Sequence, residues 1–280
     1  MRILHIGDIV GKPGRKITCQ AVPALRRIEE LDFVVANAEN VAGGAGITSD
    51  HYLELTRAGV DCITLGDHIY RRKEINSTLA KQSNIVKPAN YPPHAPGRDH
   101  AIITAANGVE VAVISLMGRV FMRPVDCPWS AADRILALLP DSVRVVLVDF
   151  HAEATSDKQL MGRYLDGRVT SVLGTHTHVT TADEQILAGG TAFQCDIGMT
   201  GPYDSILGRR VDRVMETTLT FSPTYFDVAT EDPRLAGTLV DVDPDSGRAT
   251  GIRRICLNEE DVKALVRSDQ KSPNVDQRNM

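Results

Sequence analysis

The chain has 280 residues and a net charge of −5 with neutral histidines, because 36 Asp and Glu residues outnumber 31 Lys and Arg residues. A chain of this length can bury a sizeable core. The acidic balance argues against a protein that binds duplex nucleic acid, which usually presents a basic face, and no apolar run reaches the about 20 residues that a membrane helix needs.

Five runs of β-branched and apolar residues predict buried strands, and each run leads to side chains that can bind metals. Helical segments separate the runs, which predicts parallel strands joined by right-handed crossovers. The carboxyl ends of such strands meet at one edge of a sheet, so we expect these side chains to converge on one cleft. In chain order, the runs span residues 2–8, 33–40, 62–68, 143–151 and 169–179, and they lead to Asp8, Glu39, Asn40, Asp67, His68, His151, His176 and His178.

Other segments give weaker signals. A helix is expected to begin at Thr48 or Ser49, either of which can cap it, and to stop at Gly59. Near the C-terminus, the residues at 217–221, 237–242 and 250–256 predict antiparallel strands.

The segment His176-Thr177-His178 follows the last of the five runs. Because side chains alternate along a strand, we expect both histidines on one face. Alone, this pair is equally consistent with metal ligation and with two hydrogen-bonded histidines at a strand end. Together with the other donors, it gives too many ligands for one tetrahedral zinc ion and suits two metal ions about 3.5–4 Å apart.

Taken in order, these motifs resemble those of the calcineurin-like metallophosphoesterases. The resemblance is closest to the branch of YmdB-like 2′,3′-cyclic-nucleotide 2′-phosphodiesterases, and it runs from Arg2 to about Leu257. It implies an α/β protein with a four-layer α/β/β/α sandwich. We therefore expect a single domain over residues 1–257, and then a polar C-terminal extension over residues 258–280 that is partly disordered. The matching motifs are Gly7-Asp8, Glu39-Asn40, Gly66-Asp67-His68, His151, Gly174-Thr-His-Thr-His178 and Asp196–Ser205.

The resemblance also implies two divalent or trivalent metal ions, with iron or manganese preferred over zinc or magnesium. The expected bridging ligand is Glu39. The remaining expected ligands are Asp8, Asn40 and His178 for one ion, and Asp67, His151 and His176 for the other. The implied reaction is hydrolysis of a small phosphodiester, a 2′,3′-cyclic nucleotide, by a metal-activated hydroxide. His68 is the expected general acid. Arg119 is the candidate for binding the substrate phosphate, although it can equally pair with a carboxylate.

Two positions depart from the family pattern. Val10 stands where many relatives have a metal-binding histidine, so we expect Asn40 to replace that ligand. Asp67 stands where the family normally has Asn. With two divalent cations and one hydroxide, the carboxylates of Asp8, Glu39 and Asp67 give a neutral cluster, whereas Asn at position 67 would leave one positive charge. Asp67 is therefore expected to hold metal more tightly and to attract an anionic phosphate less.

Three classes of function stay open on the sequence alone. The first is a dinuclear phosphodiesterase, which is the interpretation that we favour. The second is a non-catalytic or weakly catalytic nucleotide-binding regulatory protein that retains the metal pocket. The third is a phosphomonoesterase or nuclease. Purely structural roles also remain for single residues, since Asp8 can cap a helix and His68 can donate to a backbone carbonyl.

The expected cellular setting follows from the cysteines and the N-terminus. The first predicted strand begins at residue 2, so no signal peptide is expected. We expect a cytoplasmic protein that acts on a small phosphodiester or nucleotide, does not bind membranes and forms a homo-oligomer, as its relatives suggest. Five scattered cysteines without C-x-x-C spacing indicate reduced thiols: Cys19, Cys62, Cys127, Cys195 and Cys256.

Overall fold

The computed structural model describes residues 1–271, which fold into two β-sheets and the helices that cover them. The helices are α1 (Gly11–Ile28), α2 (Ser49–Arg57), α3 (Ile75–Lys81), α4 (Pro128–Leu136), α5 (Thr155–Leu165), α6 (Val211–Thr220) and α7 (Glu259–Lys271). As predicted, α2 begins after Thr48, whose side chain accepts a hydrogen bond from the backbone N–H of His51, and it ends before Gly59. Among these residues, no helix is both long and apolar enough to cross a membrane.

The first sheet has the strand order β2-β12-β13-β1-β3-β4-β5, and β14 pairs with β13. Its strands β1, β3, β4 and β5 are parallel, whereas β13 is antiparallel to both β1 and β14. The predicted C-terminal strands at 237–242 and 250–256 are therefore confirmed as parts of β13 and β14. The strands are β1 (Arg2–Ile6), β2 (Asp8–Ile9), β3 (Phe33–Asn37), β4 (Cys62–Thr64), β5 (Ile85–Val86), β12 (Met199–Pro202), β13 (Pro233–Val242) and β14 (Ala249–Asn258).

The second sheet has the order β10-β11-β9-β8-β7-β6, with β7, β8, β9 and β11 parallel. These strands come from the middle of the chain, between the two halves of the first sheet. They are β6 (His100–Thr104), β7 (Glu110–Met117), β8 (Val145–His151), β9 (Ser171–Thr175), β10 (Gln185–Ile186) and β11 (Ala192–Gln194).

The two sheets pack face to face because both faces of their central strands are apolar. In β1, Leu4 and Ile6 join the core beneath α1, while Ile3 joins the core between the sheets. In β8, Val146 points to the core beneath α4 and α5, while Val145 points to the core between the sheets. This alternation is what strands buried on both faces require.

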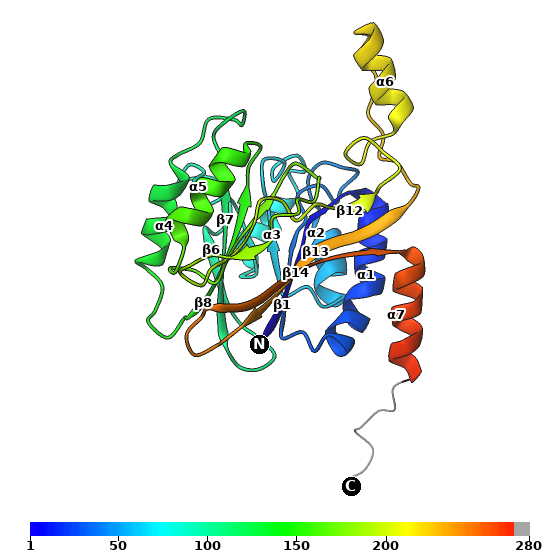
Figure 1. Cartoon of the computed structure of the whole chain (residues 1–280). Helices are drawn as coiled ribbons and strands as arrows, with labels where there is room; N and C mark the ends of the chain where they lie inside the picture. The colour runs from blue at the N-terminus through cyan, green and yellow to red at the C-terminus, as the bar shows by residue number, and fades with distance from the viewer. Residues whose placement is uncertain (272–280) are drawn as a thin grey trace.

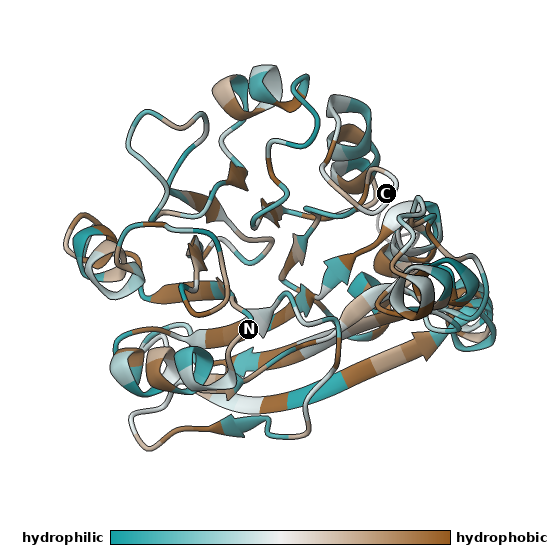
Figure 2. Cartoon of the chain, turned by 90° about the horizontal axis from the view of Figure 1, so that it is seen from above, coloured by the Kyte–Doolittle hydropathy of each residue, from teal (hydrophilic) through white to brown (hydrophobic). Residues whose placement is uncertain are grey.

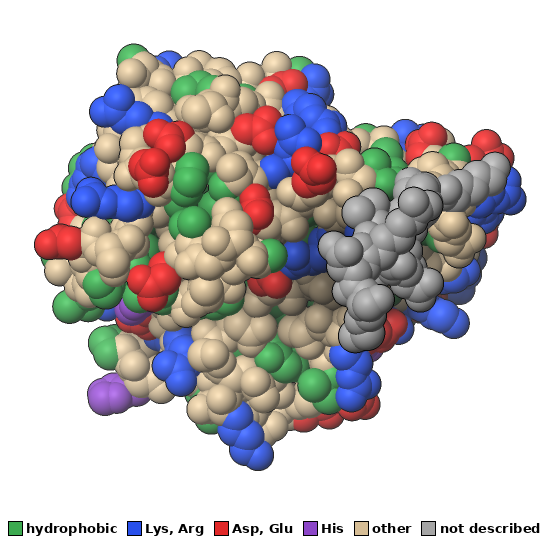
Figure 3. Space-filling view, turned by 90° about the horizontal axis from the view of Figure 1, so that it is seen from below, with side chains coloured by type: hydrophobic (Ala, Val, Ile, Leu, Met, Phe, Trp, Pro, Cys, Tyr) green, Lys and Arg blue, Asp and Glu red, His purple; other side chains and the backbone are tan. Residues whose placement is uncertain are grey.

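The resulting layers run helix, sheet, sheet, helix, which confirms the predicted α/β/β/α sandwich. Figure 1 shows α1, α2 and α7 on one side of the sheets and α4 and α5 on the other. Seen from above, the hydrophobic segments of the strands lie between the surrounding helices (Figure 2). On the face seen from below, acidic and basic side chains are interspersed (Figure 3).

The predicted strand at residues 217–221 is wrong, because these residues belong to the end of α6 and its C-cap, Phe221. The β-branched threonines suggested a strand, but Val211, Met215 and Leu219 recur every four residues, which is the helical period. Helix α6 projects from the sandwich, and none of its residues is buried (Figure 1).

Part of the predicted C-terminal extension is also ordered. Residues 259–271 form α7, whose Val262 is buried and whose Leu265 and Val266 pack against the core beneath α1. This apolar spacing explains why a polar segment still forms a docked helix. The rest of the predicted extension, residues 272–280, lies outside the described residues.

Candidate metal centre

The predicted metal ligands and His68 come together at the carboxyl edge of both sheets. Beyond the end of β1 comes Asp8, beyond β3 come Glu39 and Asn40, and beyond β4 come Asp67 and His68. From the second sheet, β8 ends at His151 and β9 ends one residue before His176. Strands that are far apart in sequence thus deliver carboxylates and imidazoles to one place, as the parallel topology requires.

One cluster of four side chains is compact enough to hold a metal ion. The ligand atoms of Glu39, Asp67, His151 and His176 all lie within 4.8 Å of one another. The Nε2 atom of His151 lies 3.3 Å from Glu39 Oε1, 3.4 Å from Asp67 Oδ1 and 3.1 Å from His176 Nδ1. A mixed nitrogen and oxygen donor set suits Fe, Mn or Zn.

A second group of donors borders Glu39. Asp8 is fully buried, and its Oδ1 atom has no hydrogen-bond partner but lies 3.9 Å from His178 Nε2. An unpaired buried carboxylate oxygen is costly, and a cation would satisfy it. Asn40 also borders this group, with its amide nitrogen 3.3 Å from His178 Nε2 and 3.1 Å from Glu39 Oε1. The side-chain amide of Asn40 must therefore rotate, so that its oxygen replaces its nitrogen, before Asn40 can bind a metal.

The outer contacts of two histidines leave a nitrogen lone pair facing the cluster. The Nε2 atom of His176 lies 3.2 Å from the Glu153 carboxylate, and Nδ1 of His178 lies 3.1 Å from the carbonyl oxygen of Leu207. Both partners only accept hydrogen bonds, so each ring donates outward and keeps its other nitrogen free for a ligand role. The cluster of Glu39, Asp67, His151 and His176 therefore fits a metal ion, and His178 keeps a free nitrogen beside Asp8.

The geometry of the two loop histidines differs from the prediction. Strand β9 ends at Thr175, and His176 and His178 have φ angles of 97° and 63°, so they do not share a strand face. The loop is held in this strained backbone by hydrogen bonds, since the Asp8 carboxylate accepts from the His176 N–H at 3.0 Å. Both rings still reach the cluster, but through loop geometry that the alternation rule does not describe.

A buried ion pair that the sequence reasoning missed supports this loop. Asp196 accepts hydrogen bonds from the backbone N–H and the hydroxyl of Thr177, at 3.1 and 2.7 Å. The same Asp196 oxygen lies 2.7 Å from Lys158 Nζ, and both side chains are buried. Asp196 opens one of the family-like motifs, which was the available signal, whereas nothing marked Lys158 as its partner.

The electrostatics of the protein without metal show how strongly the acids interact with the histidines. Burial alone would lower the pKa of His151, but the charge of Glu39 and hydrogen bonds to Asp67 and Glu39 hold it well above its usual value. Burial, together with the charge on His151, lowers the pKa of His176 to about 4. Burial raises the pKa of Asp8 to about 6. A proton on His151 therefore takes the place that a cation would fill.

His68 lies at the rim of this centre. Its Nδ1 atom lies 2.6 Å from the amide oxygen of Asn40, and its Nε2 atom lies 3.8 Å from Asp67 Oδ2. The side chain is 27% exposed, so Nε2 can meet a substrate. A hydrogen bond to the Glu39 carboxylate raises the pKa of His68, which favours the protonated ring.

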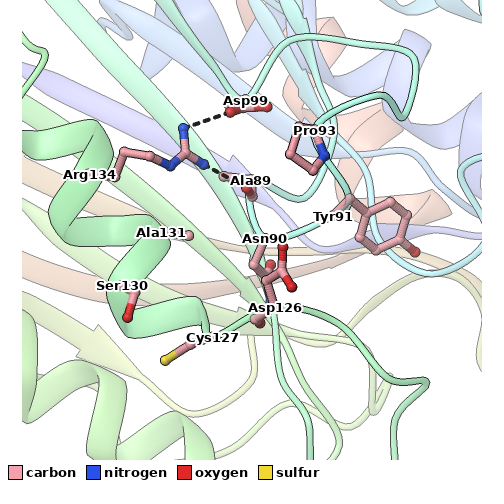
Figure 4. A pocket seen from close by; sticks show the side chains of 10 residues that line it. All are labelled: Ala89, Asn90, Tyr91, Pro93, Asp99, Asp126, Cys127, Ser130, Ala131 and Arg134. Atoms are coloured by element: carbon pink, nitrogen blue, oxygen red, sulfur yellow. Dashed lines mark hydrogen bonds and ion pairs between the residues drawn. The ribbon is translucent and has the colours of Figure 1, made fainter.

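Arg119 packs on Trp129, and a cavity beside α4 is lined by none of the candidate ligands. The Arg119 side chain is exposed, and its guanidinium carbon lies 5.5 Å from the centre of the Trp129 ring. A cavity of about 500 Å³ opens along α4, and Arg134, which lines it, pairs with Asp99 (Figure 4). None of the candidate ligands lines this cavity, so its size does not make it the reaction site.

Comparisons with known proteins agree with this fold. Residues 4–255 match the family described as YmdB-like protein. The chain is 44% identical over 260 residues to a 2′,3′-cyclic-nucleotide 2′-phosphodiesterase from Bacillus subtilis strain 168, covering 93% of this chain and 98% of that protein. A crystal structure of a hypothetical protein from Thermus thermophilus has a TM-score of 0.87 and 39% identity, covering 92% and 100%. A novel phosphatase from Mycoplasma pneumoniae has a TM-score of 0.86 and 28% identity, covering 94% and 96%.

The two-sheet sandwich and the cluster of acids and histidines at its edge define a metallophosphoesterase of the calcineurin-like type. Within this class, the chain belongs to the YmdB-like family. The fold, the family and the enzyme class predicted from the sequence, a hydrolase of phosphoric diesters, are confirmed.

Proposed function

We propose that the protein hydrolyses 2′,3′-cyclic nucleotides at a centre of two metal ions. The observation that carries this proposal is the convergence of the donor atoms of Glu39, Asp67, His151 and His176 within 4.8 Å, next to the unpaired carboxylate oxygen of Asp8. The substrate class is supported by the Bacillus subtilis relative, which is a 2′,3′-cyclic-nucleotide 2′-phosphodiesterase.

Glu39 contacts both donor groups and is suited to contact both ions. Its Oε1 atom faces both His151 Nε2 and the Asn40 amide, while Oε2 is held by the backbone N–H of His68 at 2.9 Å. Asp8, His178 and a reoriented Asn40 would hold one ion, and Asp67, His151 and His176 the other. When bound, the ions lower the pKa of water and offset the charge on the phosphate. Iron or manganese suits this donor set, and zinc or magnesium can replace them by availability.

His68 supplies the proton that the leaving group needs. In the reaction, a water oxygen bonds to phosphorus and the bond from phosphorus to the 2′ oxygen breaks, which leaves a 3′-phosphate. The 2′ oxygen leaves as an alkoxide unless it is protonated, so an acid within reach lowers the barrier. The Asn40 amide contacts Nδ1 of His68, and once reoriented it would donate to Nδ1, so that the ring hydrogen lies on Nε2 at the exposed rim. Arg119 can assist only if its side chain leaves Trp129 and turns toward the substrate.

The test is turnover of a 2′,3′-cyclic nucleotide by protein loaded with Mn²⁺ or Fe²⁺, compared with the variant Glu39→Gln. This substitution keeps the size of the side chain and removes its charge, so it should cost both bound metal and turnover. The exposed Glu110→Gln is the matched control and should leave both unchanged. A Glu39→Gln protein with full metal content and full activity would contradict the proposal.

A weaker or different activity is the second candidate. Asp67 adds a negative charge beside the place where an anionic phosphate must dock, which favours a weakly catalytic, nucleotide-binding role. The Mycoplasma pneumoniae relative is described as a phosphatase, which favours monoesters. Rates on a cyclic diester, a monoester and a polynucleotide, measured on one preparation, separate these functions.

We also propose that the chain self-associates through the segment 206–226, which contains α6. Several large apolar side chains in this segment are exposed: Leu207, Met215, Leu219, Phe221 and Tyr225, with Phe221 at 92%. Exposed apolar clusters of this kind usually mark protein contacts. Leu219→Glu should reduce the mass measured by light scattering after gel filtration, whereas an unchanged mass would contradict this assignment.

The cytoplasm is the compartment that we propose for the protein. All five cysteines are free, including the buried Cys62 and Cys195. Free thiols suit a reducing compartment, because oxidising compartments favour disulfides. Fractionation of the native cells would test this location.

A further inference from the structure

A buried polar network lies between the two sheets, directly behind the metal centre. At its centre is Asp149, which is fully buried in β8 two residues before His151. Its carboxylate accepts hydrogen bonds from side chains of three other strands, namely Asn37 of β3, Thr64 of β4 and Thr175 of β9. These four strands all lead to candidate metal ligands, so the network ties together the elements that build the site.

The directions of these hydrogen bonds can be worked out from the chemistry of each group. The carboxylate of Asp149 accepts from several donors, so the single hydrogen of the Thr175 hydroxyl points at Asp149 Oδ1, 2.6 Å away. The Thr175 oxygen therefore has only lone pairs left for His151, whose Nδ1 atom lies 2.9 Å away. In this contact, His151 must be the donor, so its Nδ1 carries the hydrogen.

The alternative partner of Nδ1 is weaker. The amide nitrogen of Asn37 lies 3.5 Å from His151 Nδ1 but 3.0 Å from Asp149 Oδ2. The amide is oriented by its oxygen, which accepts from the backbone N–H of Glu39 at 3.2 Å. The amide nitrogen thus donates to the carboxylate and also lies 3.4 Å from the Thr175 hydroxyl oxygen, so the shorter contact of His151 with Thr175 decides the state of the ring.

We propose that Asp149 and Thr175 are positioning residues that fix His151 in the tautomer with hydrogen on Nδ1 and a lone pair on Nε2. Because the Thr175 hydroxyl donates its hydrogen to the buried carboxylate, it can only accept a hydrogen bond from the imidazole. The Nε2 atom then faces Glu39 and Asp67, where the proposed function places a metal ion. Such outer contacts orient metal-binding histidines and raise their basicity. This inference rests on the proposed metal centre.

The test uses Thr175→Val, which keeps the shape of the side chain and removes the hydroxyl. Zinc alone is the probe, titrated into the metal-free protein against a chelator of known affinity. We expect at least one zinc dissociation constant to rise by about 10- to 100-fold. Thr175→Ser should restore most of the affinity, because it returns the hydroxyl.

The matched control is Thr170→Val. Thr170 is as fully buried as Thr175 and also donates a hydrogen bond, to the Gly247 carbonyl, but it lies before the start of β9, at the end far from His151. Thr170→Val should change the stability of the protein without changing its zinc affinity. If Thr175→Val does not fold, Asp149→Asn tests the same hydrogen-bond chain. The side chain of Asn has one acceptor oxygen, whereas that of Asp has two.

A spectroscopic readout separates positioning from general stability. In the zinc-loaded wild-type protein, a ¹⁵N–¹H spectrum of the histidine rings should show hydrogen on Nδ1 of His151 that exchanges slowly with water. In Thr175→Val this signal should shift and exchange faster. Zinc affinity and ring signals equal to wild type in Thr175→Val would overturn the inference. Wild-type protein that binds no zinc would instead overturn the proposed metal centre.

Discussion

Replacing Asp8 by Asn should stabilise the metal-free protein and destabilise the metal-bound protein. Asp8 is fully buried, and burial raises the pKa of its carboxyl from 3.8 to about 6. At about 1.4 kcal/mol per pH unit, keeping this side chain ionised costs the metal-free fold about 3 kcal/mol. Asn has a similar shape and carries no charge, and its oxygen can still accept from the His176 N–H, as Asp8 does.

The pH dependence of this effect has a definite sign. Because the pKa is higher in the folded state, the contribution of Asp8 to stability is fully present below pH 3.8 and is lost as the pH rises through about 6. In the presence of a chelator, the free energy of unfolding of Asp8→Asn should therefore exceed that of the wild type by about 3 kcal/mol at pH 8 and by about 1.5 kcal/mol at pH 5.

Urea unfolding followed by circular dichroism measures the stability of the metal-free protein and, with Mn²⁺ added, of the metal-bound protein. The exposed Asp141→Asn serves as the control and should show no such difference. With Mn²⁺ present, the order should reverse, because the variant lacks a ligand. An Asp8→Asn protein that is less stable than wild type in chelator at pH 8, or that keeps two bound ions, would refute the reasoning.

Three further substitutions test other parts of the site. His68→Ala should keep both ions and lose turnover by about 10²- to 10⁴-fold, with a smaller loss for substrates with good leaving groups; an equal loss for all substrates excludes a general acid. Asp67→Asn should tighten inhibition by phosphate and loosen metal, measured as inhibition constant and as metal content after mild chelation; if neither changes, the charge argument is wrong. Lys158→Met should lower the free energy of urea unfolding by about 3–5 kcal/mol, because it leaves the buried Asp196 carboxylate without its cation. Adding Asp196→Asn should recover part of this loss, and no recovery would contradict the pairing.

The convergence of the site could be predicted because it depends on local patterns and one topological rule. Runs such as those before Asp8 and His151 are strands in the structure, and parallel strands bring their carboxyl ends to one edge. The layer structure followed from the same runs and from the family resemblance.

The geometry of the His176 loop could not be predicted, because it depends on partners that are distant in the sequence. The loop is held by Asp8, which belongs to the other sheet, and by Asp196, whose charge is balanced by Lys158 from α5. No periodicity in the sequence encodes these contacts. Strand alternation likewise directs the Thr175 side chain away from the two loop histidines, yet its hydroxyl contacts His151 across neighbouring strands.

Helix α6 could not be predicted for a different reason. Its sequence holds both a β-branched run and a helical period, and the choice between them depends on what the segment packs against. Helix α6 has no buried residue, so the fold of a single chain gives its apolar face no partner within the described residues.

The most direct test of the central claim is the product formed from a 2′,3′-cyclic nucleotide. Protein carrying two Mn²⁺ or Fe²⁺ ions should convert it only to the 3′-nucleotide, activity should stop when a chelator removes the ions, and it should return when the metal is restored. If protein that holds two ions leaves the cyclic nucleotide intact, or releases a mixture of 2′- and 3′-nucleotides, the proposed function is contradicted.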